Sequence, residues 1–211
     1  NHVAPADQPF DEAEVTIAAP TVDKSFIATN QAFTADPNVA IGEMITYQVA
    51  ITVPEGTTSN AVLVDVLDSG LAFVNMVAIT ASPGVSTSVV GGFPAVASGV
   101  AVANVDGGVI NDGRRITLNF GTVTNANTND AVPETITVTY RAVVLNSSNN
   151  NRGDQRNNLA DWRWQDDFGP QNVQDSASDV RIVEPTLAVI KDASPITGQA
   201  GDTSTFTIEV R

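Results

Sequence analysis

Short segments in which apolar and polar residues alternate recur along this 211-residue chain, and they constrain its fold more than any other feature. The clearest is 44–53 (MITYQVAITV), where every second residue from Ile45 to Ile51 is aliphatic or aromatic. Successive side chains of a β-strand point to opposite faces, so this pattern predicts a strand with one face in a core. The segments 61–67, 114–123 and 134–145 show the same pattern.

Residues that favour turns separate these segments. Gly, Pro, Asn and Asp gather at 90–94 (VGGFP) and at 104–114, and both stretches are typical of turns. We expect no amphipathic helix of ordinary length. Antiparallel strands with one apolar face bury that face against a second sheet, so the chain is predicted to be all-β, an antiparallel two-sheet β-sandwich.

Composition excludes several classes of function. A hydrophobic content of 42% is enough for a packed core, and the formal net charge of −14 argues against nucleic acid and anionic lipid as partners. The absence of cysteine excludes disulfides and thiolate zinc sites. No apolar run approaches the roughly 20 residues of a membrane helix, so we expect no membrane insertion by this chain.

The end of the chain resembles its beginning. The segment 180–195 (VRIVEPTLAVIKDASP) resembles 15–26 (VTIAAPTVDKSF), and 199–210 (QAGDTSTFTIEV) resembles 40–53. Such self-similarity predicts tandem repeats, which in series form a stalk or fibre.

We therefore predict three parts with one complete repeat. The opening strands of an incomplete repeat cannot bury their own apolar face, so a neighbouring repeat or an identical subunit is expected to complete them, head to tail or by strand donation. The predicted parts are 1–19, closing strands of a preceding repeat or an N-terminal extension; 20–184, a complete β-sandwich repeat; and 185–211, opening strands of a following repeat.

Three polar residues occupy positions where alternation predicts core. Lys24 lies between Val22 and Phe26 on one face of the stretch TVDKSFI, and Asp65 and Asn158 alternate with apolar residues in their own segments. A charged group buried alone is costly, so a core lysine is expected to be neutral or paired.

The order of several motifs resembles a known family. The stretch PTVDKSF, the stretch IGEMITYQV, the turn VPEG and the segment VLDSGL follow one another, and VVLN later precedes NNLAD. This arrangement resembles the isopeptide-forming repeats of bacterial fimbriae and adhesins, over roughly 15–184 and again from 185 onward. The resemblance implies an Ig-like, CnaA-like β-sandwich repeat in an extracellular or cell-surface protein.

In that family a lysine of the first strand bonds covalently to an asparagine of the last strand, with help from a carboxylate. By position, the resemblance implies Lys24 and Asn158 as the cross-linked pair and Asp65 as the proton shuttle. A plain ion pair between Lys24 and Asp65 remains an alternative. Asn157 and Asp68 are rival candidates for the amide and the carboxylate.

We thus expect a structural module of a bacterial surface fibre, with no enzyme activity beyond self-cross-linking. The alternative is an adhesive or carbohydrate-binding module in which Trp162 and Trp164 stack on sugars. No cofactor is expected except Ca²⁺, which the carboxylate oxygens of the acidic loops could bind. An Arg-Gly-Asp stretch at 152–154 is a weak motif for receptor binding. The acidic candidates for calcium are Asp106, Asp112, Asp130, Asp166, Asp167, Asp175 and Asp179.

Overall fold

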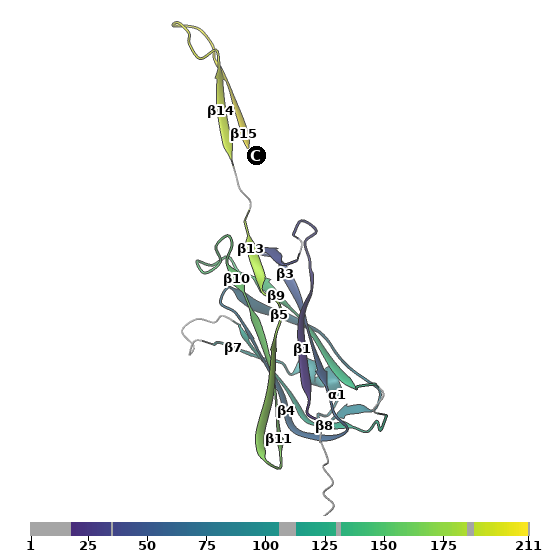
Figure 1. Ribbon diagram of the computed structural model, residues 1–211. Coiled ribbons are helices and arrows are strands. Elements are labelled where there is room, and N and C mark those ends of the chain that lie inside the picture. Colours follow the sequence, from purple (N-terminus) through teal and green to yellow (C-terminus); the bar gives the residue numbers. More distant parts are fainter. Residues whose placement is uncertain (1–17, 35, 106–112, 130–131, 185–187, 211) are drawn as a thin grey trace, which may run out of the picture.

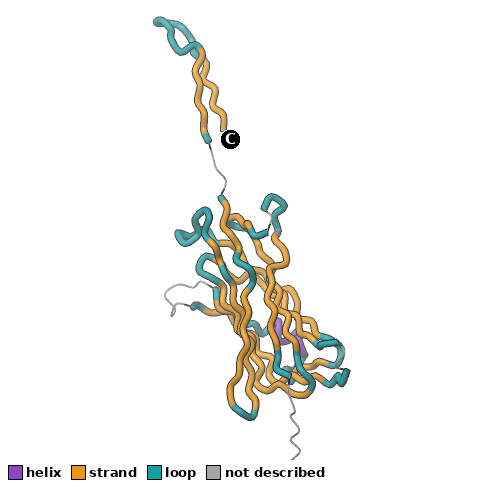
Figure 2. Tube along the Cα trace, viewed as in Figure 1, coloured by secondary structure: helices purple, strands orange, loops and turns teal. Residues whose placement is uncertain are grey.

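The structure, a computed structural model, consists of a β-sandwich and a separate β-hairpin beyond one of its ends (Figure 1). Figure 2 shows that loops gather at the two ends of the sandwich, while strands run along its length. The structure describes residues 18–34, 36–105, 113–129, 132–184 and 188–210.

Two antiparallel sheets form the sandwich. The first has the order β1–β3–β9–β5, and the second the order β12–β11–β4–β8–β6, with β7 also paired to β8. The strands of the first sheet are β1 Thr21–Thr29, β3 Met44–Thr52, β9 Thr135–Val144 and β5 Leu71–Ala81. Those of the second are β12 Gly169–Ser176, β11 Asn158–Asp166, β4 Gly56–Leu67, β8 Arg115–Asn125, β6 Val85–Thr87 and β7 Ala101–Ala103.

A small sheet closes one end of the sandwich. It has the order β10–β13–β2, and β13 and β2 run parallel. Its strands are β10 Gln155–Arg156, β13 Val180–Val183 and β2 Asn38–Ala40.

The core lies between the two large sheets. Every second residue of β3, namely Ile45, Tyr47, Val49 and Ile51, is fully buried, as the alternation predicts. Trp162 of β11 is also fully buried and packs edge-on against Phe120, with ring centroids 5.2 Å apart. The predicted all-β, antiparallel β-sandwich is therefore confirmed.

One stretch expected to be only a turn opens a helix. The helix α1, Gly92–Ser98, follows Gly91, whose φ of 92° starts the chain reversal. Pro94 falls in the first turn, where its missing N–H costs no helical hydrogen bond. Val96 is buried in the core, so packing against the sandwich stabilises a helix too short to be seen as a periodic pattern.

The hairpin beyond the sandwich consists of β14, Val189–Ser194, and β15, Thr205–Val210. Lys191 of β14 lies opposite Ile208 of β15. In the first sheet, Lys24 of β1 lies opposite Val49 of β3. Because 199–210 resembles 40–53 with Ile208 in the place of Val49, the hairpin reproduces the register of β1 and β3.

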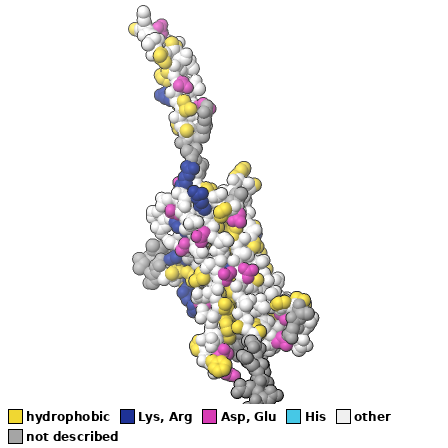
Figure 3. Space-filling model, viewed as in Figure 1, with side chains coloured by type: hydrophobic (Ala, Val, Ile, Leu, Met, Phe, Trp, Pro, Cys, Tyr) yellow, Lys and Arg dark blue, Asp and Glu magenta, His cyan; other side chains and the backbone are white. Residues whose placement is uncertain are grey.

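The hairpin exposes apolar side chains along its length. Figure 3 shows apolar and acidic side chains on both the hairpin and the drawn face of the sandwich. Phe206, Ile208 and Val210 are each more than 60% exposed. Within the described ranges, no helix has the length and apolar character needed to span a membrane.

Candidate functional site in the sandwich core

Lys24 is buried although it belongs to an edge strand. It lies in β1, at the edge of the first sheet, and is 3% exposed. Its backbone N–H points away from β3 and donates to Asp175 Oδ2 of β12 at 2.7 Å. This bond ties the edge of one sheet to the edge of the other, and the lysine side chain turns into the core.

Asp65 meets the lysine from the opposite sheet. It lies in β4, is 1% exposed, and its Oδ2 forms an ion pair with Lys24 Nζ. Because both side chains are buried, water does not stabilise their charges, and each charged form is stabilised mainly by the other.

A tyrosine hydroxyl joins the lysine to the asparagine. Tyr140 of β9 accepts a hydrogen bond from Lys24 Nζ at 2.9 Å and another from Asn158 Nδ2 at 2.6 Å. Asn158 opens β11 and is 1% exposed. The structure thus brings Lys24, Asp65 and Asn158 together at one buried place in the core, around the hydroxyl of Tyr140.

Burial shifts the acid–base balance of the pair. Desolvation lowers the pKa of Lys24 to about 8, against the opposing charge of Asp65. Desolvation also raises the pKa of Asp65, against the opposing charge of Lys24. The two shifts converge, so transfer of the proton from the ammonium to the carboxylate, which leaves both groups neutral, costs less here than in water.

Two buried oxygens in this site lack partners. Among the described residues, neither Asp65 Oδ1 nor Asn158 Oδ1 has a hydrogen-bond partner. Both are acceptors as long as Asp65 is ionised, and unpaired buried acceptors are uncommon in native proteins. A proton on Asp65 would turn one of the two into a donor.

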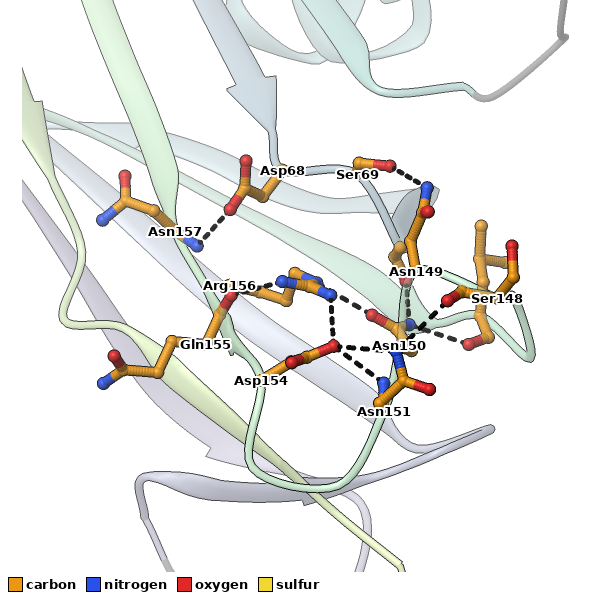
Figure 4. A network of polar contacts seen from close by, with 12 residues as sticks. Asp68, Ser69, Ser148, Asn149, Asn150, Asn151, Asp154, Gln155, Arg156 and Asn157 are labelled. Atoms are coloured by element: carbon orange, nitrogen blue, oxygen red, sulfur yellow. Dashed lines mark hydrogen bonds and ion pairs between the residues drawn. The ribbon is translucent and has the colours of Figure 1, made fainter.

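The rival candidates, Asp68 and Asn157, lie outside the buried core, and Figure 4 shows the contact between them. Asp68 is exposed at the end of β4, and its Oδ2 accepts the backbone N–H of Asn157 at 3.1 Å. The side-chain amide of Asn157 donates to Asp179 at 2.7 Å. Asn157 therefore bonds to Asp68 and to Asp179 at the surface, away from Lys24.

The Arg-Gly-Asp stretch belongs to a loop with a structural role (Figure 4). Asp154 Oδ2 accepts hydrogen bonds from the Asn151 backbone at 2.9 Å and from Arg156 at 3.1 Å. Arg156 also donates to Asn150, which is buried and in turn donates to the Gly70 carbonyl at 2.8 Å. A Cβ at Gly70 would stand 2.1 Å from Asn150 Oδ1, so this contact requires glycine.

The tryptophan and calcium predictions fare differently. Trp162 lies in the core and offers no face to a sugar, whereas Trp164 is half-buried and lines an open hollow of about 620 Å³. Asp106, Asp112 and Asp130 lie outside the described residues. In the part of the chain that the structure describes, no three acidic or histidine side chains gather as a metal site would require. Asp175 and Asp179 bond to Lys24 and Asn157 instead.

Sequence reasoning missed two members of the site, Tyr140 and Asp175. Tyr140 stands at an inward position of the segment 134–145, where an aromatic residue is unremarkable as core. The chain has only two tyrosines, Tyr47 and Tyr140, and their rings lie 5.8 Å apart beside Lys24. The small number of tyrosines was the signal in the sequence that could have pointed to Tyr140 as a member of the site.

Solved structures to which this chain is similar include subunits of bacterial pili. One is the pilus backbone protein RrgB of Streptococcus pneumoniae, with 19% identity over 70% of this chain and 32% of that chain, at a TM-score of 0.46. Another is BcpA, the major pilin of Bacillus cereus, with 15% identity over 82% of this chain and 42% of that chain, at 0.45. A third is the major pilin SpaD of Corynebacterium diphtheriae, with 15% identity over 86% of this chain and 39% of that chain, at 0.44.

The expected resemblance to fimbrial domains is confirmed as a similarity of fold. This chain spans less than half the length of each of these three pilins. No protein-family model matches the sequence, and no curated protein matches it either. At these identities and TM-scores the similarity assigns no role to any residue.

Proposed function

We propose that residues 20–184 form one module of an extracellular bacterial surface fibre, and that an isopeptide bond between Lys24 and Asn158 stiffens it. The observation that supports this most is the contact of both side chains with a single buried hydroxyl, that of Tyr140, beside the carboxyl of Asp65. Amine, carboxamide and carboxyl come from three distant segments, and ordinary packing has no need to bury them together.

The bond forms by aminolysis of the asparagine side chain. Asp65 first takes a proton from the Lys24 ammonium, which leaves a neutral amine as nucleophile. Protonated Asp65 then donates toward the Asn158 carbonyl oxygen and polarises it, while Lys24 Nζ attacks Cγ. The bond from Cγ to Nδ2 breaks, ammonia leaves, and a secondary amide joins the two side chains. Burial excludes water, which would otherwise hydrolyse the carboxamide.

The position of this bond suits a load-bearing fibre. Lys24 follows directly on the start of the sandwich, and Asn158 opens β11, the third strand from its end. Tension that enters near Pro20 would pass through the amide to β11 and leave the strands between them unloaded. β12 and β13 follow Asn158, so these two strands would still carry load.

The hairpin supports the proposal of repeated modules. The chain has only two lysines, Lys24 and Lys191, and both stand at the same register position of a strand pair. Lys191 Nζ lies 4.8 Å from the ring centroid of Phe206, and Lys24 Nζ lies 5.4 Å from that of Tyr47. We therefore assign 185–211 to the first strands of a following module, with neighbouring repeats or identical subunits as partners.

The experiment is intact-mass measurement of the purified chain. The cross-linked protein is lighter than its sequence by the mass of one ammonia, and Lys24→Met and Asn158→Ala each restore the full mass expected for the variant. Asn157→Ala is the matched control, because it removes the neighbouring amide, and this variant is expected to lose ammonia like the wild type. A wild-type chain of full sequence mass would contradict the proposal.

A further inference from the structure

The proposed cross-link requires a second proton transfer, beyond the one between Lys24 and Asp65. When Lys24 Nζ attacks, the new carbon–nitrogen bond leaves a surplus proton on that nitrogen, and the departing nitrogen of Asn158 needs a proton to leave as ammonia. Before the attack the carboxyl of Asp65 bonds to Lys24 and to the Tyr140 hydroxyl, and during the attack it is assigned to the carbonyl oxygen. A second group in contact with both nitrogens would leave the carboxyl free to serve the oxygen.

The Tyr140 hydroxyl stands between these two nitrogens. It accepts a hydrogen bond from Lys24 Nζ at 2.9 Å and one from Asn158 Nδ2 at 2.6 Å. The other tyrosine of the chain, Tyr47, packs its ring beside the same lysine, but among the described residues its hydroxyl has no hydrogen-bond partner. Of the two phenols, only that of Tyr140 bridges the groups that react.

The polarity of one of these hydrogen bonds changes during the reaction. The nitrogen of a carboxamide is planar, shares its lone pair with the carbonyl, and can only donate. After attack Cγ is tetrahedral, and Nδ2 becomes an ordinary amine with a free lone pair. It can then accept a proton from the hydroxyl to which it previously donated.

We propose that the Tyr140 hydroxyl relays the proton from the attacking nitrogen of Lys24 to the leaving nitrogen of Asn158. The hydroxyl gives its own proton to Nδ2 and receives one from Nζ, the bond between Cγ and Nδ2 breaks, and ammonia departs. Tyr140 ends as it began, so no other reactant is needed. Asp65 serves the oxygen and Tyr140 the nitrogens. This catalytic role rests on the proposed function, since it concerns the same cross-link.

A purely structural role for Tyr140 is the competing explanation. Its ring packs against Tyr47 at 5.8 Å and against Phe73 at 6.1 Å between centroids, so the residue also fills the core. Tyr140→Phe keeps the ring and removes only the oxygen. Tyr47→Phe is the matched control, because it removes an equally buried hydroxyl that bridges nothing.

The test measures the rate of cross-linking and not only its final extent. Each chain is produced by cell-free synthesis, and loss of ammonia is followed by intact mass over time at several pH values. Proton transfer by a positioned side chain is typically worth ~100-fold or more, so we expect Tyr140→Phe to be slower by about that factor and Tyr47→Phe to match the wild type. Thermal melts verify that both variants fold cooperatively.

The outcomes separate the two proposals. If the wild type never loses ammonia, the proposed function fails. If the wild type loses ammonia and Tyr140→Phe does so at the rate of Tyr47→Phe, the relay is wrong and the cross-link stands. If Tyr140→Phe does not fold, fluorotyrosine is incorporated into the Tyr47→Phe chain, where Tyr140 is the only tyrosine left. Fluorination changes the proton affinity of the Tyr140 hydroxyl, so the relay predicts a severalfold change in the rate of cross-linking. An unchanged rate overturns the relay.

Discussion

Replacing Asn158 by alanine should lower the stability of the module by an amount set by the loop that the cross-link closes. The proposed bond joins Lys24 to Asn158 and so closes most of the sandwich into one covalent ring. Restriction of the unfolded chain by a ring of this size contributes about 5 kcal/mol. For a protein of this size each kcal/mol shifts the midpoint of thermal unfolding by about 2–4 °C, so we expect a fall of roughly 10–20 °C.

A double-mutant cycle distinguishes ring closure from ordinary loss of contacts. Lys24→Met blocks the same bond from the other end, although it removes different contacts. Once either substitution has opened the ring, the second has no ring left to open. The double variant should therefore be more stable, by about 5 kcal/mol, than the sum of the two single losses predicts.

The measurement is chemical or thermal unfolding of the four chains, each with its cross-linked fraction known from intact mass. Asn157→Ala serves as the surface control, because this side chain bonds to Asp179 and not to Lys24. Additive losses in a wild type that is fully cross-linked would refute the ring-closure reasoning.

Four further predictions follow from the same geometry. In the folded chain an amine-reactive reagent should modify exposed Lys191 and not buried Lys24. After unfolding, Lys24 should stay unmodified in the wild type, because its amine is part of the cross-link, and should react in Asn158→Ala. Peptide mapping detects the modified lysines. Under tension, Asn158→Ala should release about 45 nm more chain than the wild type, from the roughly 130 residues inside the ring, and single-molecule pulling that finds equal extensions would count against the cross-link. The cross-linking rate should fall as pH rises through about 8, because the pair of Lys24 and Asp65 then loses the proton that Asp65 must donate. The rate should also fall in acid, because a second proton on the pair leaves Lys24 as an ammonium that cannot attack. A rate that keeps rising in alkali contradicts this prediction. Asp175→Ala removes the acceptor of the Lys24 backbone N–H and should slow cross-linking by loosening β1, whereas Asp179→Ala should leave the rate unchanged.

The fold could be predicted from the sequence because its dominant signal is local. The alternation in 44–53 survives intact as a buried face of β3, and Lys24 stood out because it interrupts such a face with a charged residue. Asp65 and Asn158 came from the family resemblance, and alternation agreed with a core position for both. The helix α1 could not be predicted, because seven residues carry too little periodicity and its stability comes from packing of Val96.

Tyr140 and Asp175 escaped prediction for a different reason. Tyr140 fits the alternation of its strand, so nothing in the local pattern separates a core aromatic residue from one whose hydroxyl bridges two reactive groups. Asp175 lies in β12, which pairs with β11 and only meets β1 at the open edge of the sandwich. Contacts between sheets depend on the packing of elements far apart in sequence, and a pattern within one strand does not contain them.

The distribution of positive charge in this chain also argues for a chemical role of Lys24. The sequence has eight arginines and only two lysines, so arginine supplies nearly all the positive charge. The guanidinium of arginine stays protonated at any ordinary pH and cannot act as a nucleophile, whereas a buried lysine can become neutral. A core position that needed only a cation for Asp65 would be served by arginine, which forms two parallel hydrogen bonds to a carboxylate. Lys24 and Lys191 share a register position, so under the proposed function each module would carry its lysine at the place of the nucleophile.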